Sequence, residues 1–282
     1  MNKVISFSLW GNKKQYILGA ILNADIAKKE WPEWICRFYV SPNVPESSVN
    51  ELKSRDNVEV IVMNEDESWN GMFWRFYAAS DTKVDVAIFR DADSRIGLRE
   101  KAAVDEWLAS DKKFHIMRDN CVHAWQIMGG MWGVRNWALS ELEDLIENFK
   151  YKNKHNEFGI DQLYLSIDIY PQIWKQAHIH DDWFDGFEWE EKHPFPIPRI
   201  RCKVDEKYEL QNHLMNSMSA EDRSRIWDGN ITKFENEEGD DNCEFKKCDV
   251  CGIKHDDDYI GKIEGILPSD EKKYSYLIGD LI

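Results

Sequence analysis

The sequence predicts an α/β protein in which a mostly parallel sheet is flanked by helices. Short apolar runs alternate with segments of helical spacing, an order typical of βαβ units. The run at 86–89 is apolar at every position, as expected for a strand buried on both faces of a parallel sheet. Hydrophobic residues make up 43% of the 282 residues, which is enough for a sizeable core.

Local patterns define each element in turn. Strands are expected where short apolar runs lie between Gly, Pro or polar residues, and helices where apolar residues recur every three or four positions. The expected strands span 4–9, 35–40, 58–63, 84–89, 114–117 and 126–134. The expected helices span 14–29, 46–54, 71–79, 99–109, 137–150 and 160–168. The later segment 177–182 is too polar for a buried strand, so we expect a strand end that reaches a site.

These patterns suggest one α/β domain over 1–202 and a polar, acidic C-terminal extension over 203–282 that packs on it. The net charge of −16 argues against a nucleic-acid or anionic membrane partner, because phosphate groups need a basic face. We find no apolar run long enough for a transmembrane helix and no signal peptide. Because the cysteines form no disulfide framework, we expect a cytoplasmic protein.

The apolar run at 86–89 ends at two carboxylates, Asp91 and Asp93, with Arg90 and Arg95 beside them. In an extended chain both carboxylates would point to one side, where they repel unless a cation lies between them. Oxygen ligands suit Mg²⁺ or Mn²⁺, which usually complete their shell with substrate phosphates. The ordinary alternative is a pair of solvated loop carboxylates. We predict a metal and diphosphate site.

Further motifs flank this pair. Phe73-Trp74-Arg75-Phe76 lies one helix upstream, and Asp119 follows the next expected strand. Gly129-Gly130 and Asp161-Gln162 come later, and 177–182 contains two histidines. In this order the features resemble those of GT-A-type glycosyltransferases, and in particular of the retaining galactosyl- and glucosyltransferases related to glycogenin. The resemblance covers roughly residues 3–200.

The resemblance implies a GT-A, Rossmann-like fold and transfer of a sugar from a nucleoside diphosphate sugar, with a UDP-sugar favoured. The acceptor would be a glycan or another hydroxyl compound, and the cofactor Mn²⁺ or Mg²⁺. The residues implied in donor binding are Ser8, Leu9, Trp10, Arg75, Asp91, Gly129 and Gly130. Those implied in catalysis are Asp119, Asp161 and Gln162. Those implied in metal binding are Asp91, Asp93 and His180, with His178 and Asp181 as rivals of His180.

Each implied role has an ordinary alternative. Arg75 suits a surface ion pair, Asp119 a turn, and Asp161 the start of a helix. The sequence also departs from the family, which usually has Asn-Ala/Ser-Gly where this chain has Gly129-Gly130, and a Lys-Pro-Trp signature that is missing here. The first departure leaves the identity of the donor sugar open, and from the second we expect the acceptor side to differ from that of the glycogenin-like enzymes.

A cluster near the C-terminus offers four zinc ligands. Its members are Cys243, Cys248, Cys251 and His255. It contains one Cys-x-x-Cys, the usual chelating spacing, and would form a structural Zn²⁺ site. The alternative is four unrelated reduced side chains in an acidic loop.

Two other functions fit the aspartate pair. In haloacid-dehalogenase-like phosphatases an Asp-x-Asp also follows an apolar strand, and Asp91 would then be the nucleophile. There the pair usually lies near the chain start, whereas here three expected strands precede it. The third possibility is a non-catalytic nucleotide- or sugar-binding module that has kept the fold.

Overall fold

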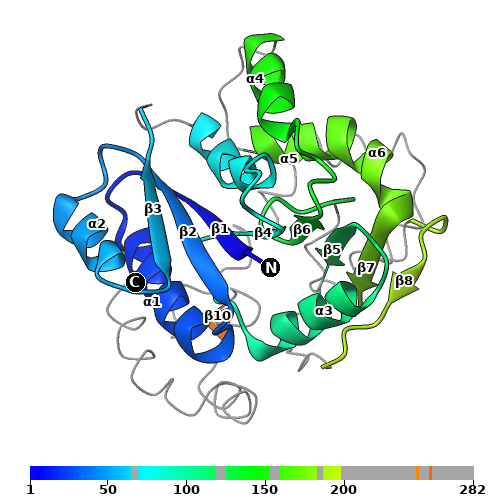
Figure 1. Ribbon diagram of the computed structural model, residues 1–282, viewed down its shortest axis with the longest axis horizontal. Helices are drawn as coiled ribbons and strands as arrows, with labels where there is room; N and C mark the ends of the chain where they lie inside the picture. Colours follow the sequence, from blue (N-terminus) through cyan, green and yellow to red (C-terminus); the bar gives the residue numbers. More distant parts are fainter. Residues whose placement is uncertain are drawn as a thin grey trace, which may run out of the picture.

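The computed structural model describes residues 1–64, 69–118, 125–152, 159–182 and 187–197, together with the backbone of two short strands near the C-terminus (Figure 1). Its elements, with η marking 3-10 or π turns, are β1 (Lys3–Leu9), α1 (Lys14–Glu30), β2 (Trp34–Val40), α2 (Glu46–Lys53), β3 (Val58–Val62), η1 (Trp69–Ala79), β4 (Val86–Arg90), α3 (Leu98–Ala109), β5 (Phe114–Arg118), β6 (Trp132–Arg135), α4 (Leu142–Lys152), α5 (Ile160–Tyr164), η2 (Leu165–Ile169), α6 (Tyr170–Ile173), η3 (Trp174–Gln176), β7 (Ala177–Asp181), β8 (Lys192–His193), β9 (Lys246–Lys247) and β10 (Lys254–His255).

The first eight described strands form one sheet in the order β3-β2-β1-β4-β6-β5-β7-β8. Among them, only β6 runs antiparallel to its neighbours, and every other adjacent pair is parallel. This confirms the predicted α/β class with a mostly parallel, mixed sheet. The strands β9 and β10 pair with each other, antiparallel.

Helices cover both faces of this sheet (Figure 1). Helices α1, α2 and α3 pack on one face, where Ile21 and Trp107 belong to one buried cluster. The other face is covered by η1, α4, α5 and α6, where Phe76 and Tyr164 belong to a second cluster. The sheet therefore has an apolar core on each side, as the apolar runs of the sequence require.

Strand β4 is buried along its whole length, as predicted. Val86 and Ile88 face the layer of α1 and α3, whereas Ala87 and Phe89 face the layer of η1. The Phe89 ring centroid lies 4.4 Å from that of Trp132 in β6. Because both faces of β4 are covered, the run has no position for a polar side chain before its end.

Some elements differ from their predicted form. The strand expected at 126–134 is extended only from Trp132, because residues 128–130 turn and the Met131 N–H donates to the Met128 carbonyl. The helix expected at 160–168 runs on to Ile173 through the π turn η2. The polar segment 177–182 forms strand β7, which is buried because its histidines are covered by α3.

The order of strands creates a switch point between β1 and β4. From β1 the chain passes through α1 to β2, which lies on one side of β1 in the sheet. It reaches β4, on the other side of β1, from η1, which covers the opposite face of the sheet from α1. Phe7 pairs with Arg90, so the two strands end side by side. Ligands of open α/β sheets bind outside the carboxyl ends of strands at such a point.

Two expectations concern the chain beyond this sheet. None of the described helices is both long and apolar enough to cross a bilayer. The extension 203–282 lies outside the described residues, apart from the backbone of β9 and β10, so the boundary near residue 202 stays a prediction.

Candidate active site at the ends of strands β1 and β4

An ion triad joins three residues of the predicted site. The Arg75 guanidinium donates through Nη1 to Asp91 Oδ1 at 2.5 Å and through Nη2 to Asp161 Oδ2 at 2.7 Å. Arg75 comes from η1, Asp91 follows β4, and Asp161 lies in the first turn of α5. The Arg75 and Asp161 side chains are 7% and 5% exposed, whereas that of Asp91 is 47% exposed. The triad is thus buried at one end and accessible at the other.

Two serines of β1 fix the backbone of Arg75. The Ser6 hydroxyl donates to the Arg75 carbonyl at 2.6 Å, and the Arg75 N–H donates to Ser8 Oγ at 2.9 Å. Both serines are buried and lie two positions apart, so they face the same side of the sheet. The Ser8 oxygen thus positions the arginine, and its predicted contact with a donor stays a prediction.

The end of β1 supplies an aromatic edge. Trp10 packs on η1, where its ring lies 6.3 Å from that of Trp74 in a T-shaped arrangement. A Cβ on Gly71 would lie 3.1 Å from the Trp10 ring, so a larger residue there would make a tight contact with that ring. Leu9 is 1% exposed and belongs to the core beneath α1, because alternate side chains of a strand face opposite ways. Its side chain therefore faces away from the triad, and the predicted donor contact of this residue stays a prediction.

The predicted glycine pair lies in a turn that packs directly on the triad. A Cβ at Gly129 would lie 2.6 Å from Arg75 Nη2 and 2.8 Å from Asp161 Oδ2. A Cβ at Gly130 would overlap Asp91 Oδ2 and lie 3.1 Å from the Asp91 nitrogen. Any larger residue would displace the charged groups, so glycine at both positions is a consequence of the triad.

Gln162 holds this glycine turn. Its Oε1 accepts from the Gly129 N–H at 3.0 Å, and its Nε2 donates to the Ile127 carbonyl. The helix that carries it begins after Gly159, whose φ of 82° is in the left-handed region that favours glycine. Gln162 therefore joins the predicted site, with its amide committed to the turn.

The loop that carries the aspartate pair is held by α1. Asn23 is fully buried, donates to the Ser94 carbonyl at 2.8 Å and accepts from the Ile96 N–H at 3.2 Å. Gly19, one turn earlier, lets the helix approach, since a Cβ there would overlap the Ala92 carbonyl oxygen. Sequence reasoning missed both residues, although a Gly and an Asn within a helical pattern are unusual enough to be a signal.

Beyond β4 the chain turns, so the aspartates do not continue an extended strand. The Ser94 N–H donates to the Asp91 carbonyl at 3.3 Å. Arg90 is buried and paired with Glu100, away from the loop. Arg95 instead stabilises the loop, with Nη1 donating to the Ala92 carbonyl at 3.0 Å.

Tyr16, in the first turn of α1, shares the environment of both aspartates. Burial is the largest cause of the raised pKa of its hydroxyl, and the charge of Asp93 raises that pKa further. A hydrogen bond with Gln15 opposes these effects, and the charge of Asp91 adds to them. In the sequence Tyr16 is only one residue of a helical pattern. That it lies near the aspartates depends on the tertiary structure.

The triad carries more negative than positive charge. Burial raises the pKa of Asp161, the Arg75 guanidinium opposes this, and the Asp91 carboxylate adds to it. Burial also disfavours the charged guanidinium, but Asp91 and Asp161 outweigh it and hold the pKa of Arg75 above its ordinary value. With Asp93 next to the triad in the chain, carboxylate oxygens are in excess, and this donor set fits a hard divalent cation.

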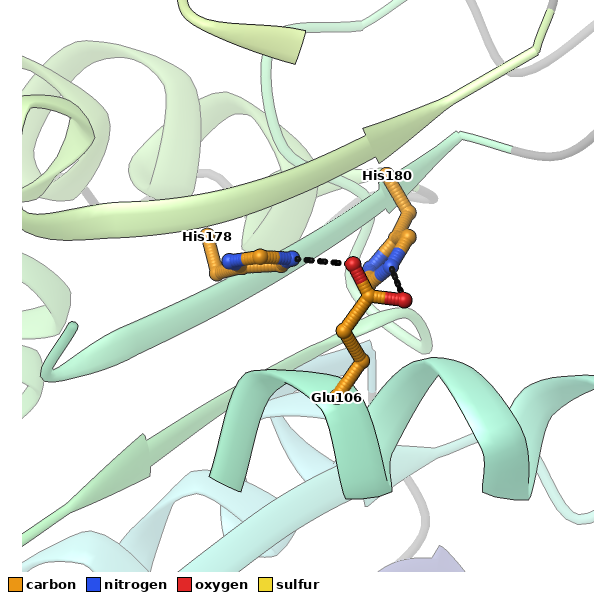
Figure 2. A group of neighbouring side chains, drawn as sticks. All are labelled: Glu106, His178 and His180. Carbon is orange, nitrogen blue, oxygen red and sulfur yellow. Dashed lines mark ion pairs between the residues drawn. The ribbon is translucent and has the colours of Figure 1, made fainter. Parts of the chain in front are cut away.

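The predicted third metal ligand, His180, is not brought to the aspartate pair. Strand β7 is separated from β4 by two strands, and His180 Nε2 lies 3.8 Å from Glu106 Oε2 on α3. Its rival His178 lies on the same face, 3.5 Å from Glu106 Oε1 (Figure 2). Asp181 is buried against Arg118 at 2.7 Å. In the described chain these residues do not cluster with the aspartate pair.

Burial lowers the pKa of the histidines in β5 and β7. Burial, followed by the charges of His178 and His193, lowers the pKa of His180 to about 3. Burial is also the main cause of the lowered pKa of His178. It holds the pKa of His115, in β5, well below its ordinary value.

Two further predictions fall outside the described residues. They concern Asp119, expected to contact the donor sugar, and the zinc cluster. The side chains of that cluster are not described, although the backbone of His255 belongs to β10. Both stay predictions.

Comparisons with known proteins give distant structural neighbours. No family model matches the sequence, and no curated protein matches it. Among solved structures, a glycosyltransferase involved in the glycosylation of the major capsid of PBCV-1 is 14% identical, with a TM-score of 0.45, over 74% of this chain and 100% of that chain. The galactosyltransferase LgtC, in complex with donor and acceptor sugar analogs, is 11% identical, with a TM-score of 0.42, over 79% of this chain and 99% of that chain. Because both likenesses are distant, we base the functional proposal on contacts within this chain.

Proposed function

We propose that this protein is a metal-dependent glycosyltransferase that moves a sugar from a nucleoside diphosphate sugar to a hydroxyl acceptor. The observation that carries the proposal is the convergence of Arg75, Asp91 and Asp161 beneath Gly129 and Gly130, at the carboxyl ends of β1 and β4. These residues come from distant parts of the chain, and a surface ion pair would not require glycines against it. The order of motifs, which resembles that of the glycogenin-like enzymes, favours a UDP-sugar.

Asp91 and Asp93 would hold the divalent ion, Mn²⁺ or Mg²⁺. Their carboxylate oxygens are the ligands that these ions prefer, and the Asp91 side chain is 47% exposed, so an ion can reach it. The bound ion would neutralise the negative charge that builds on the leaving diphosphate. Arg75 balances part of the carboxylate charge and keeps Asp91 in place.

The buried end of the triad would face the donor sugar. Gly129 and Gly130 keep side chains out of this space. Asp161 uses Oδ2 for Arg75 and has a second oxygen with which to accept from a sugar hydroxyl. Its negative charge would also stabilise the positive charge that develops on the sugar as the glycosidic bond breaks. Arg75 favours this ionised form of Asp161 against the effect of burial.

The phosphatase alternative would use Asp91 as the nucleophile and not as a metal ligand. Three strands of the sheet precede β4 in the chain, whereas the pair of such phosphatases usually lies near the chain start. A non-catalytic binding module is compatible with the same contacts, so an assay of turnover must decide against it.

A donor screen tests the proposal. We expect one nucleoside diphosphate sugar to raise the melting temperature with Mn²⁺ present and to have little effect in EDTA. A ligand at one hundred times its dissociation constant stabilises the fold by about 2.7 kcal/mol, which a thermal shift detects. Release of nucleoside diphosphate from that donor would then separate an enzyme from a binding module.

Two variants make this test specific. Asp93→Asn should abolish metal-dependent turnover. Asp56→Asn is the control and should leave turnover unchanged, because Asp56 is exposed and forms an ion pair with Lys28, outside the proposed site. Full turnover in EDTA or in Asp93→Asn would contradict the proposal. Hydrolysis of simple aryl phosphates with a phosphorylated Asp91 would support the phosphatase instead.

A further inference from the structure

A cluster of metal-binding side chains lies on the opposite flank of the sheet from the triad. His178 and His180 alternate along β7 and both face α3, from which Glu106 reaches between them (Figure 2). Glu106 Oε1 lies 3.5 Å from His178 Nε2, and Oε2 lies 3.8 Å from His180 Nε2. One ligand atom from each residue lies within 4.8 Å of the other two.

The two imidazoles have buried Nε2 atoms that lie near the Glu106 carboxylate without a hydrogen bond to it. His180 is fully buried and His178 is 6% exposed. In the described structure neither Nε2 has a hydrogen bond, and both face the Glu106 carboxylate. A buried nitrogen without a partner costs stability, so such groups usually serve a ligand, an ion or a reaction. Here two of them converge with a carboxylate.

The surroundings hold both rings in place. His180 Nδ1 lies 2.9 Å from His115 Nε2, so His180 can donate its Nδ1 proton and leave Nε2 unprotonated. His115 is itself stacked on Trp107, with the rings 12° from parallel. His178 is stacked on His193, with ring centroids 4.1 Å apart and planes 4° from parallel. Support of this kind is typical of metal ligands, whose orientation is set by the next layer of residues.

We propose that Glu106, His178 and His180 bind a divalent transition-metal ion, with Zn²⁺ the best fit. Two imidazole nitrogens and one carboxylate oxygen are a preferred zinc donor set, whereas Mg²⁺ and Mn²⁺ favour oxygen alone. Bonds of about 2.0–2.1 Å in tetrahedral geometry place ligand atoms roughly 3.3 Å apart. The two carboxylate-to-imidazole distances are 3.5 and 3.8 Å. These distances run to different carboxylate oxygens, and one ligand atom from each residue lies within 4.8 Å of the other two. Binding would therefore draw the three groups together, and Glu106, whose side chain is 44% exposed, has room to move.

The charges around the site allow such an ion. Arg99 is the cation that contributes to the lowered pKa of His180, and its guanidinium pairs with Asp182 at 2.6 Å. The same guanidinium lies 3.6 Å from the Phe195 ring centroid, which keeps it on that ring. Glu106 offers the negative charge that two neutral imidazoles lack.

This ion would be structural and separate from the one proposed for glycosyl transfer. It would join α3 to β7, two elements that otherwise meet through side chains alone, since α3 is not hydrogen-bonded into the sheet. It is bound by nitrogen and oxygen on the α3 face, and the proposed catalytic ion by oxygen at the end of β4. Because the two sets of ligand atoms differ, we expect each site to prefer a different metal ion.

Metal analysis of the 282-residue chain tests the proposal. The chain is stripped with a chelator, incubated with Zn²⁺ and desalted, and bound zinc is measured by mass spectrometry. Glu106→Gln should bind zinc at this site at least tenfold more weakly. Asp105→Asn is the matched control, since Asp105 is an exposed neighbour on the same helix that pairs with Lys101. It should bind zinc as the native chain does.

The predicted cysteine cluster requires its own control. Cys248→Ser should leave the Glu106-dependent zinc in place. Co²⁺ bound at that site should lack the intense thiolate charge-transfer absorption of a cysteine site. Glu106→Gln with unchanged zinc affinity would overturn the proposal, and so would loss of all zinc in Cys248→Ser. His178→Gln removes another proposed ligand, so this variant should also bind zinc more weakly than the native chain, as Glu106→Gln does.

Discussion

Replacement of Arg75 by Met measures what the buried ion triad contributes to stability. Met keeps most of the apolar stem and removes the guanidinium. Asp161, 5% exposed, is then a buried carboxylate with another carboxylate nearby and no counter-charge. Breaking a buried pair in this way costs about 3–5 kcal/mol. Because Asp91 is 47% exposed and screened by water, we expect the lower end, about 3 kcal/mol.

A second substitution separates this charge effect from lost packing. In Arg75→Met the added change Asp161→Asn removes the stranded charge, so the double variant should be more stable than the sum of the single losses predicts. Residues of one ion network couple by about 0.5–3 kcal/mol, and we expect a value near the upper end. Urea denaturation followed by tryptophan fluorescence gives each free energy of unfolding.

Arg37 offers a matched control. It is also buried and lies between two carboxylates, Glu59 at 2.6 Å and Asp81 at 2.8 Å. Those side chains are 46% and 29% exposed, so water can solvate them when the arginine is lost. Arg37→Met should cost about 1 kcal/mol. If Arg75→Met costs no more than Arg37→Met, or if the double variant shows no coupling, the triad does not hold the charge balance described above.

Two further predictions concern the same site. Gly130→Ala should lower turnover strongly, because an added Cβ would overlap the Asp91 carboxylate. Gly97→Ala is the control and should leave turnover unchanged, since a Cβ there meets nothing within 4 Å. Equal turnover in the two variants would contradict the packing of the glycine turn on Asp91. Burial raises the pKa of Asp161 above its unfolded value of about 3.9. The folded state then holds a proton that the unfolded chain releases, so this group makes stability fall as pH rises from about 3.9 through the folded pKa. Asp161→Asn should remove that part of the fall, and an unchanged pH profile of urea denaturation would show that Asp161 does not titrate abnormally.

Much of the fold was predictable from the sequence because local patterns report burial and period. The apolar run of β4 predicted a central strand, and its five residues are buried. The alternation of strands and helices predicted the mostly parallel sheet. The antiparallel β6 was not predicted, since its direction depends on where the preceding glycine turn packs. The buried strand β7 was not predicted either, because its polar histidines are covered by α3 and by His193, which come from other parts of the chain.

For the candidate site, the sequence by itself determined the residue types and their order. Arg75, Asp91, Gly129 and Asp161 were each named from a motif, but a motif fixes no distance between them. Tertiary structure decided that one guanidinium joins two aspartates 70 residues apart in the chain, and that glycine is required against them. It also placed His180 with Glu106 and not with the aspartates, because neighbours across a sheet depend on strand order, which local sequence does not encode.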